Sequence, residues 1–445
     1  MIDKRYKYYI IGIGGIGMSG IARYLKSLGF NVLGHDNVSS QITDALISEG
    51  IKINFIDSIK VIPFEILNNK SIVIYSSAIT NKNCQLKYFK QNKFKIFKRS
   101  EFLFEITKKS KCIAIAGTHG KTTTTGILTH IFIENNINFS SLIGGMLRGN
   151  KKNMINSGDD YFIVEADEYD RSFLDLNPRV GCITSIDSDH LDIYKNFNNL
   201  EKAFIEFSNN ITETKIVEKS IPIDGITYSI KEKADYYVEN ISRLKNGYQF
   251  NLIYPHGCIE KVFFNQFGKH NLSNAIAALA VSTELGIEIK KSTKCLSKFP
   301  GIKRRFDIFF ESKDKVLIDD YAHHPSEIEV VYKALDETFP NDQKCVFFQP
   351  HLYSRTRDLM KDFAKVLGLF DRVYLLDIYP ARELPIPKIN SFELASLIKC
   401  SNTFLINKDQ LLNEVISVKE KIISFLGAGD IGDEVQKIKK YFIKI

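Results

Sequence analysis

The chain reads Gly117-Thr118-His119-Gly120-Lys121-Thr122-Thr123 directly after an apolar run, residues 112–116, that is typical of a buried strand. Apolar residues then recur at helical spacing within 127–132. A glycine loop in this setting binds phosphate, because backbone N–H groups and the helix N-terminus converge on phosphate oxygens. We predict that Lys121 neutralises the β- and γ-phosphates of a nucleotide and that Thr122 offers its hydroxyl to Mg²⁺. The full pattern has a further glycine where Ile115 stands.

Length and composition predict a soluble cytoplasmic enzyme. A chain of 445 residues with 44% hydrophobic residues is long enough for about three domains with separate cores. The net charge of +8 comes from lysines spread along the chain, which argues against a nucleic-acid surface. Seven scattered cysteines without CxxC spacing indicate free thiols in a reducing compartment. We see no signal peptide and no apolar run that could insert in a membrane, and we expect a monomer or homodimer.

Strand and helix patterns alternate along the whole chain, which predicts an α/β protein with mainly parallel sheets. Three domains are expected. Residues 1–107 would form an N-terminal Rossmann-like domain, 108–301 a central P-loop ATPase α/β domain, and 302–445 a C-terminal Rossmann-like domain. Short strands and turns over 216–264 indicate an antiparallel insertion at one edge of the central sheet.

Another glycine loop lies near the N-terminus, where Gly12-Ile13-Gly14-Gly15-Ile16-Gly17 follows a strand and fits GxGxxG. In chain order, residues 12–17 are the first glycine loop and residues 117–123 the second. Gly14, Gly15 and Gly17 would cradle a phosphate, and Asp36, which ends the next strand, would bind a ribose. A purely structural tight turn is the alternative. Two loops for two anions suggest one nucleotide as a substrate carrier and another as an energy source.

Carboxylates end the strand pattern of residues 163–170, and Glu165 is the best candidate for a Mg²⁺ ligand. Its neighbours Asp167, Glu168 and Asp170 could instead form a solvated acidic loop. The next strand runs into Asp187-Ser188-Asp189-His190-Leu191-Asp192. His190 is either a ligand of a second divalent ion or a capping residue. We expect Glu165 and His190 at adjacent strand ends.

The last polar groups lie further along the chain. His270 could stack on a base and Asn271 and Asn274 could bind it, although all three could equally cap a helix. The basic run 303–305 follows a probable hinge and suits phosphate contact. The segments 319–325 and 349–357 should bring His, Asp and Arg side chains to neighbouring strand ends, in a crevice that could fix a carboxylate.

Taken together, these motifs resemble the Mur ligase family over nearly the whole chain. The residues that carry the resemblance are Gly117-Thr118-His119-Gly120-Lys121-Thr122, Glu165-Ala166-Asp167-Glu168, Asp189-His190-Leu191-Asp192, His270-Asn271-Leu272-Ser273-Asn274-Ala275, Lys303-Arg304-Arg305 and Asp320-Tyr321-Ala322-His323-His324-Pro325. The resemblance implies that the N-terminal domain holds a UDP-linked substrate, the central domain binds ATP, and the C-terminal domain brings the amino acid and closes the cleft.

The motifs at 12–20, 76–79 and 348–351 resemble those of the family branch that adds alanine. The implied activity is ATP-dependent ligation of L-alanine to the muramoyl carboxylate of UDP-N-acetylmuramate in peptidoglycan precursor synthesis. An acyl phosphate would be the intermediate, with ADP and phosphate as products. The tripeptide-adding recycling branch of the family is the nearest alternative. A nicotinamide-dependent oxidoreductase and a nonenzymatic nucleotide sensor are alternatives of other classes.

The resemblance also implies residue roles. ATP would contact Gly117, Thr118, His119, Gly120, Lys121, Thr122, Thr123, His270, Asn271, Asn274, Arg304 and Asp320. Two divalent ions, taken to be Mg²⁺, would be held by Thr122, Glu165 and His190. The two other substrates would contact Gly14, Gly15, Gly17, Asp36, Ser76, Ser77, Tyr321, His323, His351 and Arg355. The catalytic residues would be Lys121, Glu165, His190 and His323, with His323 as the base that takes the proton of the incoming amine.

The sequence departs from relatives at three positions. Phe204 stands where relatives that add later residues carry a carbamylated lysine, which fits the alanine-adding branch. Leu352 stands where many alanine-adding enzymes have an arginine, so Arg355 or Arg357 would have to supply its contacts. Ser185 occupies a place often held by asparagine.

Overall fold

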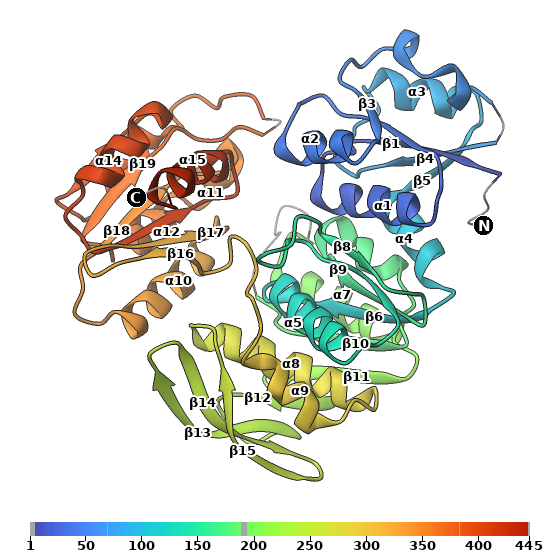
Figure 1. Cartoon of the computed structure of the whole chain (residues 1–445). Helices are drawn as coiled ribbons and strands as arrows, with labels where there is room; N and C mark the ends of the chain where they lie inside the picture. The colour runs from blue at the N-terminus through green and yellow to red at the C-terminus, as the bar shows by residue number, and fades with distance from the viewer. Residues whose placement is uncertain (1–4, 69, 188–193, 382, 444–445) are drawn as a thin grey trace. The chain divides into compact units, whose positions relative to one another are not determined.

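The computed structural model describes residues 5–68, 70–187, 194–381 and 383–443. Residue contacts group the chain into two compact units, the first made of Met1–Asn265 and Ser273–Pro300 and the second of Gln266–Leu272 and Gly301–Ile445. They contain three sheets of five, ten and six strands, drawn in Figure 1 in blue, in green to yellow, and in orange to red. In the described part of the chain, none of the helices has the length and apolar character needed to cross a bilayer.

The first sheet is wholly parallel, in the order β3-β2-β1-β4-β5. The chain leaves β1 toward β2 on one side and returns to β4 on the other, so the strand order reverses at the carboxyl end of β1. Ligands bind at such a switch point in open α/β sheets. The elements of this sheet are β1 (Lys7–Ile11), α1 (Ile16–Ser27), β2 (Val32–His35), α2 (Gln41–Ser48), β3 (Lys52–Asn54), η1 (Ile59–Val61), η2 (Phe64–Ile66), β4 (Ser71–Tyr75), α3 (Cys84–Gln91), β5 (Lys95–Lys98) and α4 (Arg99–Thr107).

The second sheet is mixed, in the order β15-β14-β13-β12-β11-β10-β6-β9-β7-β8. Its elements are β6 (Lys111–Ala116), α5 (Lys121–Glu134), β7 (Phe139–Leu142), β8 (Met154–Asn156), β9 (Tyr161–Ala166), η3 (Tyr169–Asp175), β10 (Val180–Ile183), α7 (Phe197–Asn209), β11 (Thr214–Glu218), β12 (Ile226–Ser229), β13 (Tyr236–Leu244), β14 (Gly247–Tyr254), β15 (Gly257–Phe264), α8 (Lys269–Glu284) and α9 (Ile289–Leu296).

The expected antiparallel insertion over 216–264 is only partly correct. The strands β11, β12 and β13 continue the parallel order from β10, and antiparallel pairing on this side begins between β13 and β14. The turn at Asp224-Gly225 joins β11 to β12, which pair in parallel. Gly225 packs against the neighbouring strand, since a Cβ on it would lie 2.8 Å from the Lys215 carbonyl oxygen.

The third sheet has the order β16-β17-β21-β18-β19-β20 and is parallel except for β16. Separate apolar cores lie on its two faces. The elements are β16 (Asp307–Glu311), β17 (Val316–Asp320), α10 (Pro325–Thr338), β18 (Lys344–Phe348), α11 (Tyr353–Asp358), α12 (Met360–Leu367), β19 (Arg372–Leu375), α13 (Ser391–Leu397), β20 (Thr403–Leu405), η4 (Lys408–Gln410), α14 (Leu411–Ser417), β21 (Ile422–Leu426) and α15 (Ile431–Ile443).

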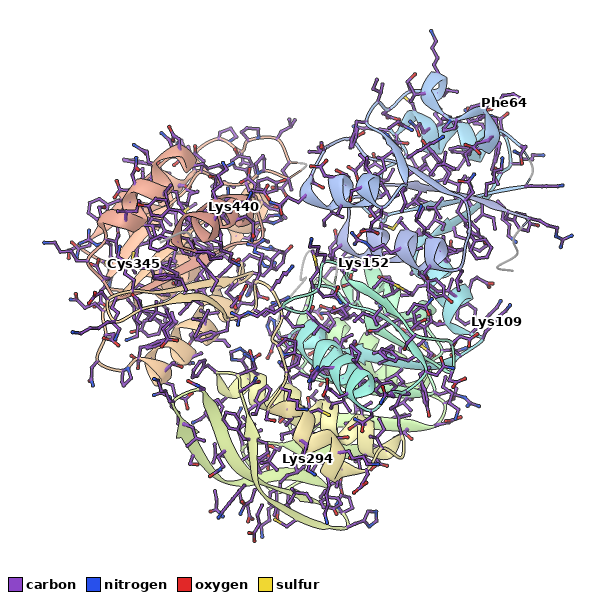
Figure 2. The ribbon with its side chains drawn as sticks, in the orientation of Figure 1. Phe64, Lys109, Lys152, Lys294, Cys345 and Lys440 are labelled. Atoms are coloured by element: carbon purple, nitrogen blue, oxygen red, sulfur yellow. The ribbon has the colours of Figure 1, made fainter. Side chains whose placement is uncertain are left out.

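All seven cysteines are free thiols, as predicted. Cys345 is buried in β18 within the third sheet and is labelled in Figure 2. Phe64, also labelled there, is by contrast 90% exposed. Burial raises the pKa of the Cys345 thiol well above its usual range, so this thiol stays protonated and packs as an apolar group.

One apolar core runs through both sheets of the first unit, from Tyr8 of β1 to Val217 of β11. Arg23 adds a buried polar connection, because its guanidinium donates to the Asn153 side-chain oxygen at 2.7 Å. The Asn153 amide in turn donates to the Ile16 carbonyl at 2.6 Å. The first glycine loop is therefore held against the central domain from which the second loop projects.

Phe204 belongs to this core and not to a ligand site. It lies on the buried face of α7, where its ring packs edge-on against Phe173 with centroids 5.1 Å apart. Phe207 stacks on Phe173 with ring centroids 5.0 Å apart. Phe204 is therefore a packing residue of this core.

We predict that Phe204→Ala lowers the free energy of unfolding by about 3–5 kcal/mol, because a fully buried ring leaves a cavity that its neighbours cannot fill. The next residue of the same helix, Ile205, is 40% exposed, so Ile205→Ala should cost less than about 1 kcal/mol. Urea unfolding followed by circular dichroism measures both. Equal losses for the two variants would show that α7 does not pack as described.

Candidate active site

The second glycine loop and the carboxylates lie side by side because their strands are direct neighbours. The strands β6 and β9 are parallel, with Ile115 opposite Glu165 and Ala116 opposite Ala166. Both strands therefore end at the same edge of the sheet, where the chain enters the loop at Gly117 and the acidic segment after Ala166. This edge is where ligands bind in parallel sheets.

The end of β10 supports the glycine loop. Gly117 has a φ of 136°, and a Cβ at this position would overlap the Thr184 hydroxyl. The Thr184 hydroxyl donates to the Ala116 carbonyl at 3.0 Å. The Ser185 hydroxyl accepts from the His119 N–H at 2.9 Å and lies 2.9 Å from the Thr118 hydroxyl. The loop geometry is therefore fixed from the neighbouring strand end.

Lys121 begins α5 and is held by a carboxylate that the sequence had left ambiguous. Its ammonium donates to the Gly117 and Thr118 carbonyls, and to both oxygens of Glu168 at 2.9 and 2.7 Å. Burial disfavours the charged lysine, but the carboxylates of Glu168, Asp167 and Glu165 outweigh it, and the pKa of Lys121 is raised. Lys121 is therefore a cation, and Glu168 is part of the site and not a solvated residue.

Thr122 and Glu165, the predicted magnesium ligands, lie together beside the second glycine loop. The Thr122 hydroxyl donates to a Glu165 oxygen at 3.0 Å, and the Gly144 N–H donates to the other oxygen. Mg²⁺ takes oxygen ligands and completes its shell with water and substrate phosphates, so this donor pair beside a phosphate loop fits it. Over the described residues, no group of three or more His, Cys, Asp or Glu side chains could hold a metal by itself.

His190, the third predicted metal ligand, lies outside the described residues, as does the rest of 188–193. The expectation that its strand adjoins the strand of Glu165 is wrong. The strand β6 lies between β9 and β10, so the ends of β9 and β10 lie on opposite sides of the end of β6. The sequence could not show this, because strand order depends on pairing between distant segments.

Arg99 connects the acidic segment to the first glycine loop, and no sequence pattern had pointed to it. Its guanidinium donates to Asp167 at 2.9 Å. Its other terminal nitrogen lies over Gly17, 2.6 Å from where a Cβ would be. Burial raises the pKa of Asp167, but Arg99 and Lys121 outweigh this effect and lower it. Arg99 is the first residue of α4, where a positive charge interacts unfavourably with the helix dipole. Its contacts with Asp167 and with the first glycine loop offset this cost.

The first glycine loop is contacted by Asp36 and Ser76, two of the residues predicted to bind the UDP substrate. One Asp36 oxygen accepts from the Gly14 N–H at 2.8 Å and the other from the Val38 N–H at 3.3 Å. Ser76 lies beside Gly12, where a Cβ would be 3.2 Å from the serine Cβ. Gly15 directly precedes α1. Ser77 is exposed and lies just after the end of β4. The carboxylate of Asp36 thus shapes the loop, and its contact with a ribose stays a prediction.

The predicted adenine residues separate between the two units. Asn274 lies in the first unit, next to Gly120, where a Cβ would overlap its side-chain oxygen. His270 and Asn271 fall in the stretch that groups with the second unit. The Asn271 side-chain amide donates to the Phe267 carbonyl at 2.8 Å. A helix N-cap would instead accept a hydrogen bond from a backbone N–H through its side-chain oxygen.

In the second unit, His323 and His351 come together with their ring centroids 6.0 Å apart. Their strands, β17 and β18, are not neighbours as expected, since β21 lies between them. The chain after β21 passes close by because Gly427 carries no side chain: a Cβ there would lie 2.8 Å from the Gln349 carbonyl oxygen.

Both histidines are neutral. Burial lowers the pKa of His323, with Arg355 acting in the same direction, and it lowers that of His351 to about 3. The Nδ1 of His323 lies 2.9 Å from the Tyr321 carbonyl, which assigns the proton to Nδ1 and leaves Nε2 as an acceptor. His351 Nδ1 and Arg355 Nη1 are buried and find no hydrogen-bond partner in the described part of the chain. These groups are suited to a polar ligand.

Arg304 and Asp320 make contacts within their own unit. The Arg304 guanidinium donates to Asp319 at 3.2 Å and to the Gly427 carbonyl at 2.5 Å, and it lies 5.1 Å from the ring centroid of Tyr321. Arg305 lies over the same ring at 5.5 Å. Asp320 accepts from the backbone N–H groups of Phe306 and Ala322. The contacts of Arg304 and Asp320 with ATP stay a prediction.

Comparisons with known families cover nearly all of the chain. Residues 7–111 match the description "Mur ligase family, catalytic domain", residues 115–282 match "Mur ligase middle domain", and residues 304–429 match "Mur ligase, glutamate ligase domain". A protein of Christiangramia forsetii is 44% identical over 97% of both chains, and one of Flavobacterium psychrophilum is 42% identical over 99% of this chain and 98% of its own. Both are named UDP-N-acetylmuramate–L-alanine ligase.

Solved structures show the same architecture. The UDP-N-acetylmuramate–alanine ligase MurC of Thermotoga maritima superposes with a TM-score of 0.85 at 26% identity, covering 98% of this chain and 99% of its own. A murein peptide ligase of Psychrobacter arcticus superposes with a TM-score of 0.74, covering 99% of both chains. Its 22% identity supports a shared fold only.

We predict that Gly117→Ala destabilises the protein by more than about 2 kcal/mol, because it combines a strained φ with overlap on Thr184 and on the Ser185 backbone N at 2.9 Å. Gly29 also has a positive φ, 82°, but nothing lies within 4 Å of its Cβ position. Gly29→Ala should therefore cost only the backbone strain, about 1 kcal/mol. Urea unfolding compares the two variants, and similar losses would contradict the close contact at Gly117.

We predict that Asp320 makes the protein more stable at pH 5 than at pH 7. Burial raises the pKa of its carboxyl to about 6, against about 3.9 in the unfolded chain, so the folded state binds the proton more tightly. Its contribution to the free energy of unfolding should rise by up to roughly 3 kcal/mol as the pH falls through 6 toward 4. Urea unfolding at several pH values measures this slope. Asp320→Asn should flatten it, and an unchanged slope would refute the assignment.

Proposed function

This chain belongs to the Mur ligase family, and from that premise we propose that it joins L-alanine to the muramoyl carboxylate of UDP-N-acetylmuramate at the expense of ATP, with release of ADP and phosphate, in the synthesis of peptidoglycan precursors. The observation that carries the proposal is the grouping of Lys121, Thr122 and Glu165 at one sheet edge, in a chain more than 40% identical to ligases of that name over their whole length.

The phosphates of ATP would lie in the loop of residues 117–123, where the N-terminus of α5 and the ammonium of Lys121 favour anions. Mg²⁺ between Thr122 and Glu165 would neutralise charge on the transferred phosphoryl group, and His190 would serve a second ion. His270, Asn271 and Asn274 would contact the base, and Arg304 and Asp320 other parts of ATP.

The UDP-linked substrate would bind on the first glycine loop, at the strand-order reversal beside β1. Gly14, Gly15 and Gly17 would face its phosphates, with Asp36, Ser76 and Ser77 around the remainder. We propose domain boundaries after residues 107 and 301, so that each of the three sheets serves one substrate. A cytoplasmic location is part of the proposal.

Little covalent chemistry is asked of the side chains. A carboxylate oxygen of the muramoyl group attacks the γ-phosphorus, and the bond to the β–γ bridging oxygen breaks to release ADP. The amine of L-alanine then attacks the acyl carbon, and the carbon–oxygen bond to phosphate breaks. Positioning and charge neutralisation supply most of the rate in such transfers.

The proton lost by the amine needs an acceptor, and we propose His323. Its neutral ring keeps a lone pair on Nε2 because Nδ1 donates to the Tyr321 carbonyl. Tyr321, His351 and Arg355 would hold the amino acid and the acyl phosphate. The unpartnered nitrogens of His351 and Arg355 support a role in binding an anion such as the alanine carboxylate.

We predict that phosphate release from ATP with Mg²⁺ and UDP-N-acetylmuramate requires L-alanine. Glycine, L-serine and the tripeptide of the recycling reaction are the matched amines. Mass spectrometry should show a product heavier by one alanyl residue.

Release with the tripeptide alone would assign the chain to the recycling branch. If none of the amines supports phosphate release, ligation is refuted. An absorbance change with a nicotinamide cofactor would favour an oxidoreductase. Each arm uses the full chain, so the result does not depend on separating its domains.

A further inference from the structure

Glu168 is a buried carboxylate with a rigid backbone. It has no exposed surface, although the acidic segment around it is at the protein surface. Its carbonyl accepts from the Tyr194 hydroxyl at 2.6 Å and from the Arg171 N–H at 3.0 Å. The side chain is therefore directed at Lys121 by a fixed main chain.

The ammonium of Lys121 has no N–H to spare in this arrangement. An ammonium has three N–H donors. Their acceptors are the Gly117 carbonyl, the Thr118 carbonyl and the two oxygens of Glu168. A phosphate oxygen can reach Lys121 only if one of these acceptors gives way. The backbone carbonyls belong to the fixed loop, so Glu168 is the acceptor that must yield.

The other carboxylates of the segment have different partners. Glu165 accepts from Thr122 and from the Gly144 N–H, and Asp167 accepts from Arg99. Asp170 is exposed. The contact with Lys121 is therefore specific to Glu168 and not a general property of an acidic surface.

We propose that Glu168 is a positioning residue of the ATP site that holds Lys121 in the nucleotide-free protein and competes with the terminal phosphates of ATP and ADP for its ammonium. The inference rests on the proposed function, since it takes the loop to be the ATP site. Competition of this kind limits the affinity for both nucleotides. It thereby favours release of ADP, because a product that is bound less tightly dissociates faster, and product release limits turnover in many enzymes.

Glu168→Gln tests the inference, because glutamine keeps the shape and one acceptor oxygen but loses the charge. We expect Glu168→Gln to bind ADP with Mg²⁺ about tenfold more tightly than the wild-type protein in isothermal titration calorimetry, with the other substrates absent. In the full reaction, the KM for ATP and kcat should both fall as ADP release slows. A purely structural role would not tighten ADP binding.

Asp170→Asn is the matched control. It removes the same charge from the same segment, at a backbone φ of 55° that asparagine accepts well, and Asp170 is exposed and is not one of the described hydrogen-bond acceptors of Lys121. Its affinity for ADP should stay within about twofold of wild type. Equal tightening in both variants would reduce the effect to general electrostatics and overturn the proposal.

Unchanged or weaker ADP binding by Glu168→Gln would also overturn it. If that variant does not fold, Glu168→Asp keeps the charge but withdraws it by one methylene, and it should tighten ADP binding in the same direction; no tightening there counts against the proposal. These measurements need no amino acid, so they stay informative if alanine proves to be the wrong amine. Absence of ADP binding by the wild-type protein would instead refute the ATP site itself.

Discussion

Parallel pairing of β6 with β9 is the constraint on which the candidate site depends. It sets Ile115 opposite Glu165, so that the glycine loop and the acidic segment leave the sheet at one edge. A register shift of one residue would turn Glu165 to the other face of the sheet, away from Thr122. The pairing is secured by buried apolar residues along both strands, among them Ile113 and Ile163. The position of the polar site is therefore determined by apolar packing below it.

Local features could be predicted from the sequence because their physical causes are local. The loop at 117–120 needs glycines where φ is positive, and the chain has Gly117 and Gly120 there. Strand and helix periodicity predicted the α/β class and the three sheets. The identity of Phe204 as an apolar side chain, and not a modifiable lysine, was likewise evident before its packing against Phe173 was known.

Features that depend on contacts between distant segments could not be predicted in this way. The insertion of β6 between β9 and β10, and of β21 between β17 and β18, follows from strand pairing that no short motif encodes. Arg99 is an arginine at a helix start with no pattern around it, yet it meets both Asp167 and Gly17. Glu168 could not be told from its exposed neighbour Asp170, because burial in an irregular loop has no periodic signal.

The charges near the second glycine loop favour the proposed binding of a divalent cation with the nucleotide. Near the second glycine loop, the cations Lys121 and Arg99 face the carboxylates of Glu165, Asp167 and Glu168. These five side chains together carry one excess negative charge. A nucleotide triphosphate adds more negative charge to the same edge. Lys121 cannot compensate by itself, since its ammonium is already paired with Glu168. This electrostatic balance favours a cation that enters with the nucleotide, and the oxygen pair of Thr122 and Glu165 would supply ligands to a hard cation such as Mg²⁺.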